Sequence, residues 1–203
     1  MVGHDLVNSA DHRRDVELVR AACAGEDGSY AGLVDRHLAS VYAVVARIVI
    51  NRDDAEDLTQ ETFVRAFERL ALYDMERCFR NWILKIATNL AINHLRRQRR
   101  ERVVRLQLVE ERKAKANPAP RTDEIPGSGQ WRHLLGQLDE MQRTAIVLFH
   151  FEQMPCAEIA DVLDVPATTV RTHLHRGRRR LRELMSNCRV AGNGSWTVAI
   201  QNG

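Results

Sequence analysis

Residues 158–184 read EIADVLDVPATTVRTHLHRGRRRLREL, and this stretch decides the fold of the last third of the chain. It predicts a short helix over residues 157–163, a turn at residues 164–166 and a second helix over residues 167–185, because apolar side chains recur at helical spacing on both sides of the turn. Two short helices joined by a tight turn form a helix-turn-helix. The positions expected to be buried are Ile159, Ala160, Leu163, Val170, Leu174, Gly177, Leu181 and Leu184.

The second of these helices has the composition of a DNA-reading helix. Residues 165–182 hold six arginines and no acidic residue. A major groove admits one helix, and residues near the N-terminal end of that helix meet base edges. Thr168 and Thr169, with free backbone amides at the helix start, suit a phosphate oxygen. Arg171 and Arg176 can each offer two parallel donors to guanine, worth ~1–3 kcal/mol of discrimination. The predicted DNA contacts are Thr168, Thr169, Arg171, Thr172, His173, His175, Arg176 and Arg179.

An ordinary helical hairpin with a solvated arginine face is the alternative to a DNA-reading element. The coincidence of the turn pattern with an acid-free second helix favours DNA binding. His173 adds the hypothesis of a weakly pH-dependent DNA contact, which pH-independent binding between about pH 6 and 8 would exclude.

The composition is that of a soluble globular protein. The chain has 203 residues, of which 44% are hydrophobic and 28% charged, with a formal net charge of +3. No apolar run is long enough to span a bilayer, and the polar N-terminus lacks the apolar core of a secretion signal, so we expect no membrane insertion and a cytoplasmic protein. Four cysteines lie far apart, which is typical of reduced thiols that pack as small hydrophobes.

A proline- and glycine-rich segment divides the chain into two helical domains. Residues 117–130 read NPAPRTDEIPGSGQ and show no periodic apolar pattern, so we interpret them as a linker. The predicted fold class is all-α: a domain over residues 15–100, a basic run and flexible linker over 101–130, a helix-turn-helix domain over 131–187 and a tail over 188–203 to which no function is assigned.

The first domain is predicted to be a small orthogonal bundle of amphipathic helices. Its helices are expected over residues 14–23, 30–50, from 53 onward and over 79–97. Asp53 and Glu56 have the spacing of a capping box at the start of the third helix. In the second domain, one helix is expected over residues 131–151, followed by a break at Pro155.

The acidic stretch DDAED at residues 53–57 is the nearest approach to a metal site. Asp53, Asp54 and Asp57 could mimic a metal cluster, but a capped helix start explains them better. There is no glycine-rich phosphate loop and no nucleophile with a nearby base, so we expect no enzyme, no metal and no cofactor.

Three segments together resemble one family. Residues 54–70, DAEDLTQETFVRAFERL, look like the helix with which extracytoplasmic-function sigma factors bind core RNA polymerase. Residues 79–100, FRNWILKIATNLAINHLRRQRR, are similar to the segment of that family that reads and melts the −10 promoter element. Residues 158–184 resemble its −35 reader. The three lie in the family's order, with its linker between the second and the third.

The resemblance implies a transcription initiation factor of the sigma-70 family. It implies that a face with Asp54, Asp57, Gln60 and Glu61 docks on a coiled coil of the largest polymerase subunit, and that the second domain meets the polymerase flap. A solvated helix face is the alternative for these acidic residues. Family members are commonly silenced by an anti-sigma protein that wedges between the two domains, which the linker here permits.

The resemblance also assigns the −10 contacts. Asn89 and Asn93 would read bases, and Arg96 and Arg97 would hold phosphates, as these side chains are able to do. Tyr73 lies in the segment that corresponds to the family's pocket for a flipped base and could stack there, although a tyrosine packed on the surface is equally compatible with the sequence. Trp82 corresponds to a core tryptophan.

A stand-alone regulator that binds an operator as a dimer is the second function compatible with the sequence. The single reading helix, the long tether and the lack of an evident ligand or receiver domain argue against it. A footprint that spans two promoter elements only when core polymerase is present would separate the two functions.

Overall fold

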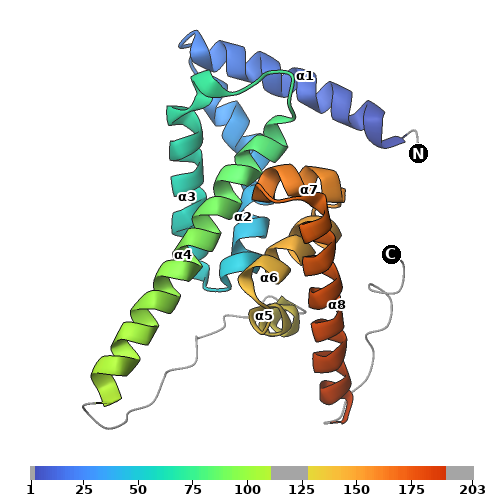
Figure 1. Ribbon diagram of the computed structural model, residues 1–203. Helices are drawn as coiled ribbons and strands as arrows, with labels where there is room; N and C mark the ends of the chain where they lie inside the picture. The colour runs from blue at the N-terminus through green and yellow to red at the C-terminus, as the bar shows by residue number, and fades with distance from the viewer. Residues whose placement is uncertain (1–2, 111–127, 191–203) are drawn as a thin grey trace. The chain divides into compact units, whose positions relative to one another are not determined.

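The computed structural model describes the backbone of residues 3–110 and 128–190 and the side chains of residues 10–102 and 131–186. Every regular element in these ranges is helical (Figure 1), which confirms the predicted all-α fold. The chain divides into two compact units, the first built mainly on residues up to Arg99 and the second mainly on later residues. Among the described helices, none combines the length and the apolar character that crossing a bilayer requires.

The first unit is a bundle in which α2 packs against both α1 and α3. Two of its helices are longer than predicted: α1 begins at residue 3 rather than 14, and α4 continues to residue 110, so the first part of the basic run is helical. Residues 98–110 contain neither glycine nor proline, which explains why the helix does not stop. The elements are α1 (Gly3–Cys23), α2 (Ser29–Val49), α3 (Arg52–Glu68), η1 (Leu70–Leu72) and α4 (Phe79–Glu110).

Helix α3 is capped by a residue that the sequence analysis did not choose. The backbone of Asn51 is extended, and its side chain accepts a hydrogen bond from the Asp54 amide at 3.1 Å. The predicted capping box of Asp53 and Glu56 is therefore wrong, and Glu56 instead accepts a hydrogen bond from Arg52 within the first turn. Asparagine caps helices as well as aspartate does, and Asp53 still lies in the first turn, where a negative charge favours the helix start.

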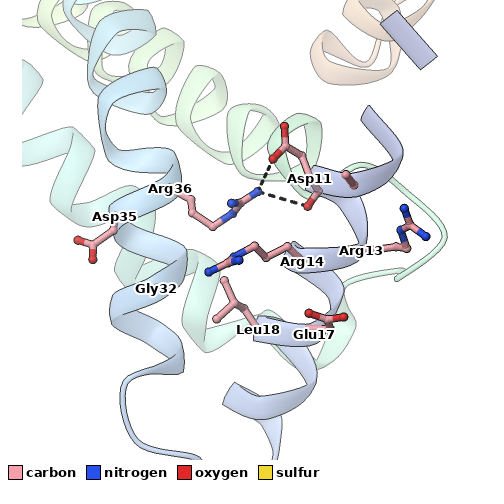
Figure 2. Close-up of a pocket in the computed structure, with 9 residues that line it drawn as sticks. Asp11, Arg13, Arg14, Glu17, Leu18, Gly32, Asp35 and Arg36 are labelled. Atoms are coloured by element: carbon pink, nitrogen blue, oxygen red, sulfur yellow. Dashed lines mark hydrogen bonds and ion pairs between the residues drawn. The ribbon is translucent and has the colours of Figure 1, made fainter. Parts of the chain in front are cut away.

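A buried carboxylate joins α1 to α2. Asp15 is 3% exposed, accepts a hydrogen bond from Arg36 Nε at 2.8 Å and lies 3.1 Å from His37 Nε2. Burial raises the pKa of Asp15, but the hydrogen bonds with His37 and Arg36 outweigh burial and leave that pKa below its ordinary value. Figure 2 shows Arg36 also reaching Asp11 beside an open hollow between the two helices. The cluster thus joins α1 and α2 by packing and by electrostatic attraction.

An aromatic cluster fixes the start of α4. The rings of Tyr73, Phe79 and Trp82 have centroids 5.2–5.4 Å apart, and His37 of α2 lies 5.0 Å from Phe79. Phe79 is completely buried. Such edge-on and tilted contacts add to the burial of the rings themselves. Trp82, for which the resemblance implied a core position, packs in this cluster and is half-buried.

The second unit differs from the prediction at its beginning. The helix expected over residues 131–151 is interrupted at residues 137–139, because Asp139 caps a new helix by accepting a hydrogen bond from the Met141 amide at 3.1 Å. The next helix then ends in a π-helical segment. The elements are α5 (Ser128–Gly136), α6 (Glu140–Ile146), η2 (Val147–Phe151), α7 (Cys156–Leu163) and α8 (Ala167–Val190).

The buried side chain of Arg143 stabilises the break between α5 and α6. Its side chain is 7% exposed and donates hydrogen bonds to the carbonyls of Gly136 and Leu138, both at 3.2 Å. These carbonyls lie at and just beyond the end of α5, where acceptors lose their helical partners. Burial lowers the pKa of Arg143 from its ordinary value. The guanidinium thus supplies a donor to two carbonyls at this break, of which the one of Leu138 is buried.

Gly177 permits a close contact between α8 and α6, as predicted from the sequence. A Cβ at this position would lie 3.1 Å from Ile146 Cγ1 and 3.4 Å from Gln142 Cβ of α6. Val170, Leu174 and Leu181 are buried on the same stripe of α8. The prediction that a missing side chain lets another helix approach is confirmed.

Replacing Asp15 is expected to weaken the first unit at neutral pH. Asp15→Asn removes the charge that binds Arg36 and His37, and we expect a loss of about 1–3 kcal/mol in the free energy of unfolding at pH 7. Because the folded pKa of Asp15 lies below the unfolded one, its contribution is complete above about pH 4 and is lost as the pH falls through the folded value. The difference between the variant and the parent should therefore shrink in acid.

Urea unfolding followed by Trp82 fluorescence, with Trp131 and Trp196 replaced by Phe, measures this difference. Asp35→Asn, at an exposed position of α2, is the matched control and should behave as the parent. If the difference in the free energy of unfolding between Asp15→Asn and the parent were the same at pH 7 and pH 3, the charge of Asp15 would not stabilise the contact between α1 and α2.

A second prediction concerns the contact at Gly177. Gly177→Val should destabilise the second unit by about 1–3 kcal/mol, because the added methyl groups overlap Ile146 and Gln142. His175→Val introduces the same side chain at an exposed position of the same helix and should cost well under 1 kcal/mol. Thermal unfolding by circular dichroism checks both, and equal melting temperatures would show that the contact is not tight.

Candidate nucleic-acid interface

Helix α8 leaves one face exposed and buries the opposite face. Val170, Leu174, Gly177 and Leu181 form the buried stripe. At 3.6 residues per turn, the positions on the other side of the helix follow one another at spacings of four, three and four residues. These positions are exposed, and all of them belong to the set predicted from the sequence: Thr168, Thr172, His175 and Arg179.

The turn before α8 has the geometry of a helix-turn-helix. Asp164 ends α7 in the left-handed conformation with φ 54°, which aspartate tolerates better than most residues. The Pro166 carbonyl accepts hydrogen bonds from the amides of Thr169 and Val170 at 2.8 and 3.2 Å. The expectation of a free Thr169 amide is therefore wrong, and a phosphate at this helix start has only the amides before residue 169 available.

The arginines of α8 are not equivalent. Arg178 lies over the Phe149 ring at 4.9 Å and donates from Nε to His150 Nε2 at 3.2 Å, so it is used within the domain. Burial lowers the pKa of His150, and the positive charge of Arg178 lowers it further, which keeps this histidine a neutral acceptor. Arg179 and Arg180 lie 3.7 and 3.4 Å from carboxylate oxygens of Glu183.

Two arginines remain for a partner near the start of the helix. Arg171 and Arg176 are exposed on either side of the outward face, and among the described residues no carboxylate lies at ion-pair distance from them. His173 and Thr169 lie at the edge of the buried stripe and are half-buried. The Nδ1 atom of His173 is buried without a hydrogen-bond partner in the described structure.

Helix α4 carries a second polar face. Asn89, Asn93, Arg96 and Arg97 are exposed, as predicted, and the first three follow at spacings of four and three residues along one side. This side is opposite to the contacts that hold α4 in the bundle. Amide and guanidinium groups in one line can bind base edges and phosphates along a nucleic-acid strand.

Tyr73 is not available for stacking on a base in this conformation. Its side chain is 5% exposed, packs on Phe79 and Trp82, and its hydroxyl donates to the Arg77 carbonyl. Burial raises the pKa of Tyr73 well above its ordinary value. The structure therefore places this ring in the core. Both alternatives considered from the sequence, stacking on a flipped base and packing on the surface, are wrong for this conformation.

The outward face of α3 is acidic with an apolar centre. Asp57 and Gln60 are exposed and Glu61 is half-buried, in an ion pair with Arg65 one turn away. Val64 follows on the same face and is 56% exposed, a residue that the sequence analysis missed. The sequence did contain an indication of this: Val64 is an apolar residue that falls, by helical spacing, among the polar residues of α3 and not among its core residues. Acidic residues around an exposed valine suit a basic or amphipathic protein surface.

Asp54 behaves differently from the other acidic residues predicted with it. Its Oδ2 accepts a hydrogen bond from Gln98 at 3.0 Å and lies 3.2 Å from His94 Nε2, in ion-pair range but without hydrogen-bond geometry. Both partners belong to α4. Asp54 therefore fastens α3 to α4 in addition to any contact with a partner.

Comparison with known families agrees with these surfaces. Residues 33–101 match sigma-70 region 2, which covers α3 and the exposed asparagines of α4. Residues 128–181 match sigma-70 region 4, which covers the helix-turn-helix. The chain belongs to the extracytoplasmic-function sigma factors of the sigma-70 family. It is a transcription initiation factor, and core RNA polymerase and promoter DNA are the partners of its family.

Relatives of this sigma factor are matched over most of their length. It is 29% identical to SigW of Bacillus subtilis over 168 residues, which cover 78% of this chain and 90% of SigW. It is 31% identical to CarQ of Myxococcus xanthus over 164 residues, which cover 79% of this chain and 91% of CarQ. Among solved structures it is similar to CnrH in complex with the cytosolic domain of CnrY, with 27% identity, a TM-score of 0.63, and coverage of 86% of this chain and 98% of CnrH.

Breaking the Asp54 contact should loosen α4 in this sigma factor. Asp54→Ala removes the acceptor of the Gln98 hydrogen bond and the contact with His94, so the first unit should lose about 1 kcal/mol in the free energy of unfolding. Asp57→Ala, on the exposed side of the same helix, should change it by less than about 0.5 kcal/mol. Urea titrations checked by Trp82 fluorescence measure both, and equal stabilities would show that Asp54 has no such structural role.

Proposed function

We propose that this sigma factor uses three exposed helix faces in turn: the α3 face binds core polymerase, the α4 face binds the −10 element, and the α8 face binds the −35 element. The observation that carries the proposal is that each face lies opposite a buried stripe or anchoring contact, within the family region that matches it. The protein acts in the cytoplasm and catalyses no reaction of its own.

The α3 face suits a coiled coil of the largest polymerase subunit. Asp57, Gln60 and Glu61 supply acceptors, and Val64 supplies apolar area at the centre of the face. Charged residues at the rim of such a surface guide association, whereas the apolar centre contributes most of the affinity. Asp54 contributes by holding α3 and α4 together and adds charge at the edge. The second unit contacts the polymerase flap, which the sequence resemblance implies.

The α4 face suits a promoter strand whose bases become accessible. Asn89 and Asn93 can each form two hydrogen bonds with an adenine, and Arg96 and Arg97 bind the adjoining phosphates. The buried Tyr73 is left out of this set. Recognition of unpaired bases by these side chains favours the melted over the paired −10 element, and this preference is how a protein without an active site assists melting.

The α8 face suits the major groove of a −35 element. Thr168, Thr172 and His175 face outward at the helix start, where base edges are reached. Arg171 and Arg176, without an acidic partner among the described residues, are able to bind guanine. Arg179 follows on the same face, where phosphates are the nearer target, and the half-buried Thr169 and His173 lie at the edge of the contact.

Regulation by a protein partner is part of the proposal. CnrH, a protein to which this chain is similar, was solved in complex with the cytosolic domain of CnrY. An anti-sigma protein that covers the α3 face of this chain would prevent polymerase binding without touching DNA. If an anti-sigma protein acts at this face, it should compete with core polymerase for the parent chain. It should not compete for the Val64→Asp variant.

Run-off transcription with purified core polymerase over a library of promoter sequences tests the function. We expect transcripts from templates that share two short elements, and a footprint over both elements only when polymerase is present. Arg171→Ala should lower promoter affinity about tenfold and relax the preference for one base pair in the −35 element.

The matched control for this variant is Arg180→Ala, which removes an arginine paired with Glu183 away from the outward face. Its promoter preference should equal that of the parent. Tight binding to a single operator without polymerase, together with no transcript from any template, would instead identify a stand-alone regulator.

A further inference from the structure

The end of α4 is an exposed arginine-rich rod. Every residue from 96 to 102 is exposed, and five of the seven are arginines: Arg96, Arg97, Arg99, Arg100 and Arg102. In Figure 1 this end of α4 extends beyond the other helices of the first unit. The segment buries no apolar surface of its own, and its like charges repel one another, so packing does not account for its composition.

The rotation of this rod about its axis is fixed by two contacts with α3. His94 and Gln98, one turn apart, both meet the Asp54 carboxylate. They mark the side of α4 that faces the bundle. Since α4 runs without interruption from residue 79 to residue 110, the direction of every side chain beyond Gln98 follows from its spacing.

That spacing continues the DNA face of α4 past its predicted end. Asn89, Asn93, Arg96 and Arg100 follow at intervals of four, three and four residues, so they lie within about 60° of one another around the helix. The side of His94 and Gln98 is about 100–180° away from them. Arg102 lies on the far side from Arg100, rotated by about 160°. One face of the rod is therefore a direct continuation of the asparagine face, and the other is not.

We propose that Arg100 binds a backbone phosphate of the duplex that adjoins the −10 element, and that the rod serves as a rigid arm for this contact. The inference rests on the proposed role of Asn93 in reading that element. Seven residues of helix place Arg100 about 10 Å beyond Asn93, which corresponds to about three base pairs.

Duplex phosphates fit this segment better than single-stranded bases or a protein. Residues 96–102 contain no aromatic side chain on which an unpaired base could stack. They also contain no apolar side chain of the kind that anchors protein interfaces. Guanidinium groups without apolar or aromatic neighbours bind phosphates through paired, charge-assisted hydrogen bonds. The contact supplies affinity and register rather than sequence preference.

The salt dependence of promoter binding tests the contact. Holoenzyme made from the full chain and core polymerase is titrated onto promoter DNA between about 50 and 200 mM salt. One lost phosphate contact lowers the slope of log affinity against log salt by about 0.9. We expect this reduction for Arg100→Gln and the parental slope for Arg102→Gln, which removes the same charge from the same exposed helix on the other side.

A second measurement locates the phosphate. Neutral methylphosphonates are placed one at a time in the duplex around the −10 element. The substitution about three base pairs from the base read by Asn93 should weaken the parent but not Arg100→Gln. An effect at an unpaired position instead would overturn the assignment to duplex DNA.

Equal slopes for the parent and Arg100→Gln would overturn the inference, and so would equal losses for Arg100→Gln and Arg102→Gln, since charge alone would then suffice. In both cases run-off transcripts from the variants would show that the proposed initiation function still holds. A parent that gives no transcript from any template would be a failure of the function itself, distinguishable from a failure at Arg100.

Discussion

Each helix that carries a proposed contact is held on one side, and this constraint determines which side it offers to a partner. In α8 the close approach of Gly177 to α6 and the buried leucines leave Thr172 and His175 outward. In α4 the carboxylate of Asp54 holds one side, so that Asn89 and Asn93 project from the other. A helix that could rotate freely would present no fixed sequence of side chains to a promoter.

The same constraint separates charges that stabilise the fold from charges that remain for a partner. Arg143 satisfies carbonyls at the end of α5, and Arg178 lies on Phe149 and His150. Asp15 accepts a hydrogen bond from Arg36 and lies at hydrogen-bond distance from His37. These residues look like surface charges in a sequence, yet removal of Asp15 or Arg143 would leave a buried polar group without its partner.

Periodicity predicted most of the fold and of the candidate faces, because burial of one stripe is a local property of an amphipathic helix. It placed the turn at residues 164–166 and the buried stripe through Gly177 correctly. It failed where two local signals compete: Asn51 rather than Asp53 caps α3, and Asp139 starts a new helix inside an apolar run. It also ended the fourth helix too early, at residue 97, because an arginine-rich segment without glycine or proline remains helical in the absence of packing.

The sequence by itself determined that the chain is helical, that its second half contains a helix-turn-helix, and that arginine-rich segments occur beside both predicted DNA readers, because composition and spacing are properties of the chain. Only the tertiary structure decided which of those side chains are available. Tyr73 is buried by two aromatic neighbours, and Asp54 is bound to α4. Residues distant in sequence make these contacts, and no local pattern contains them.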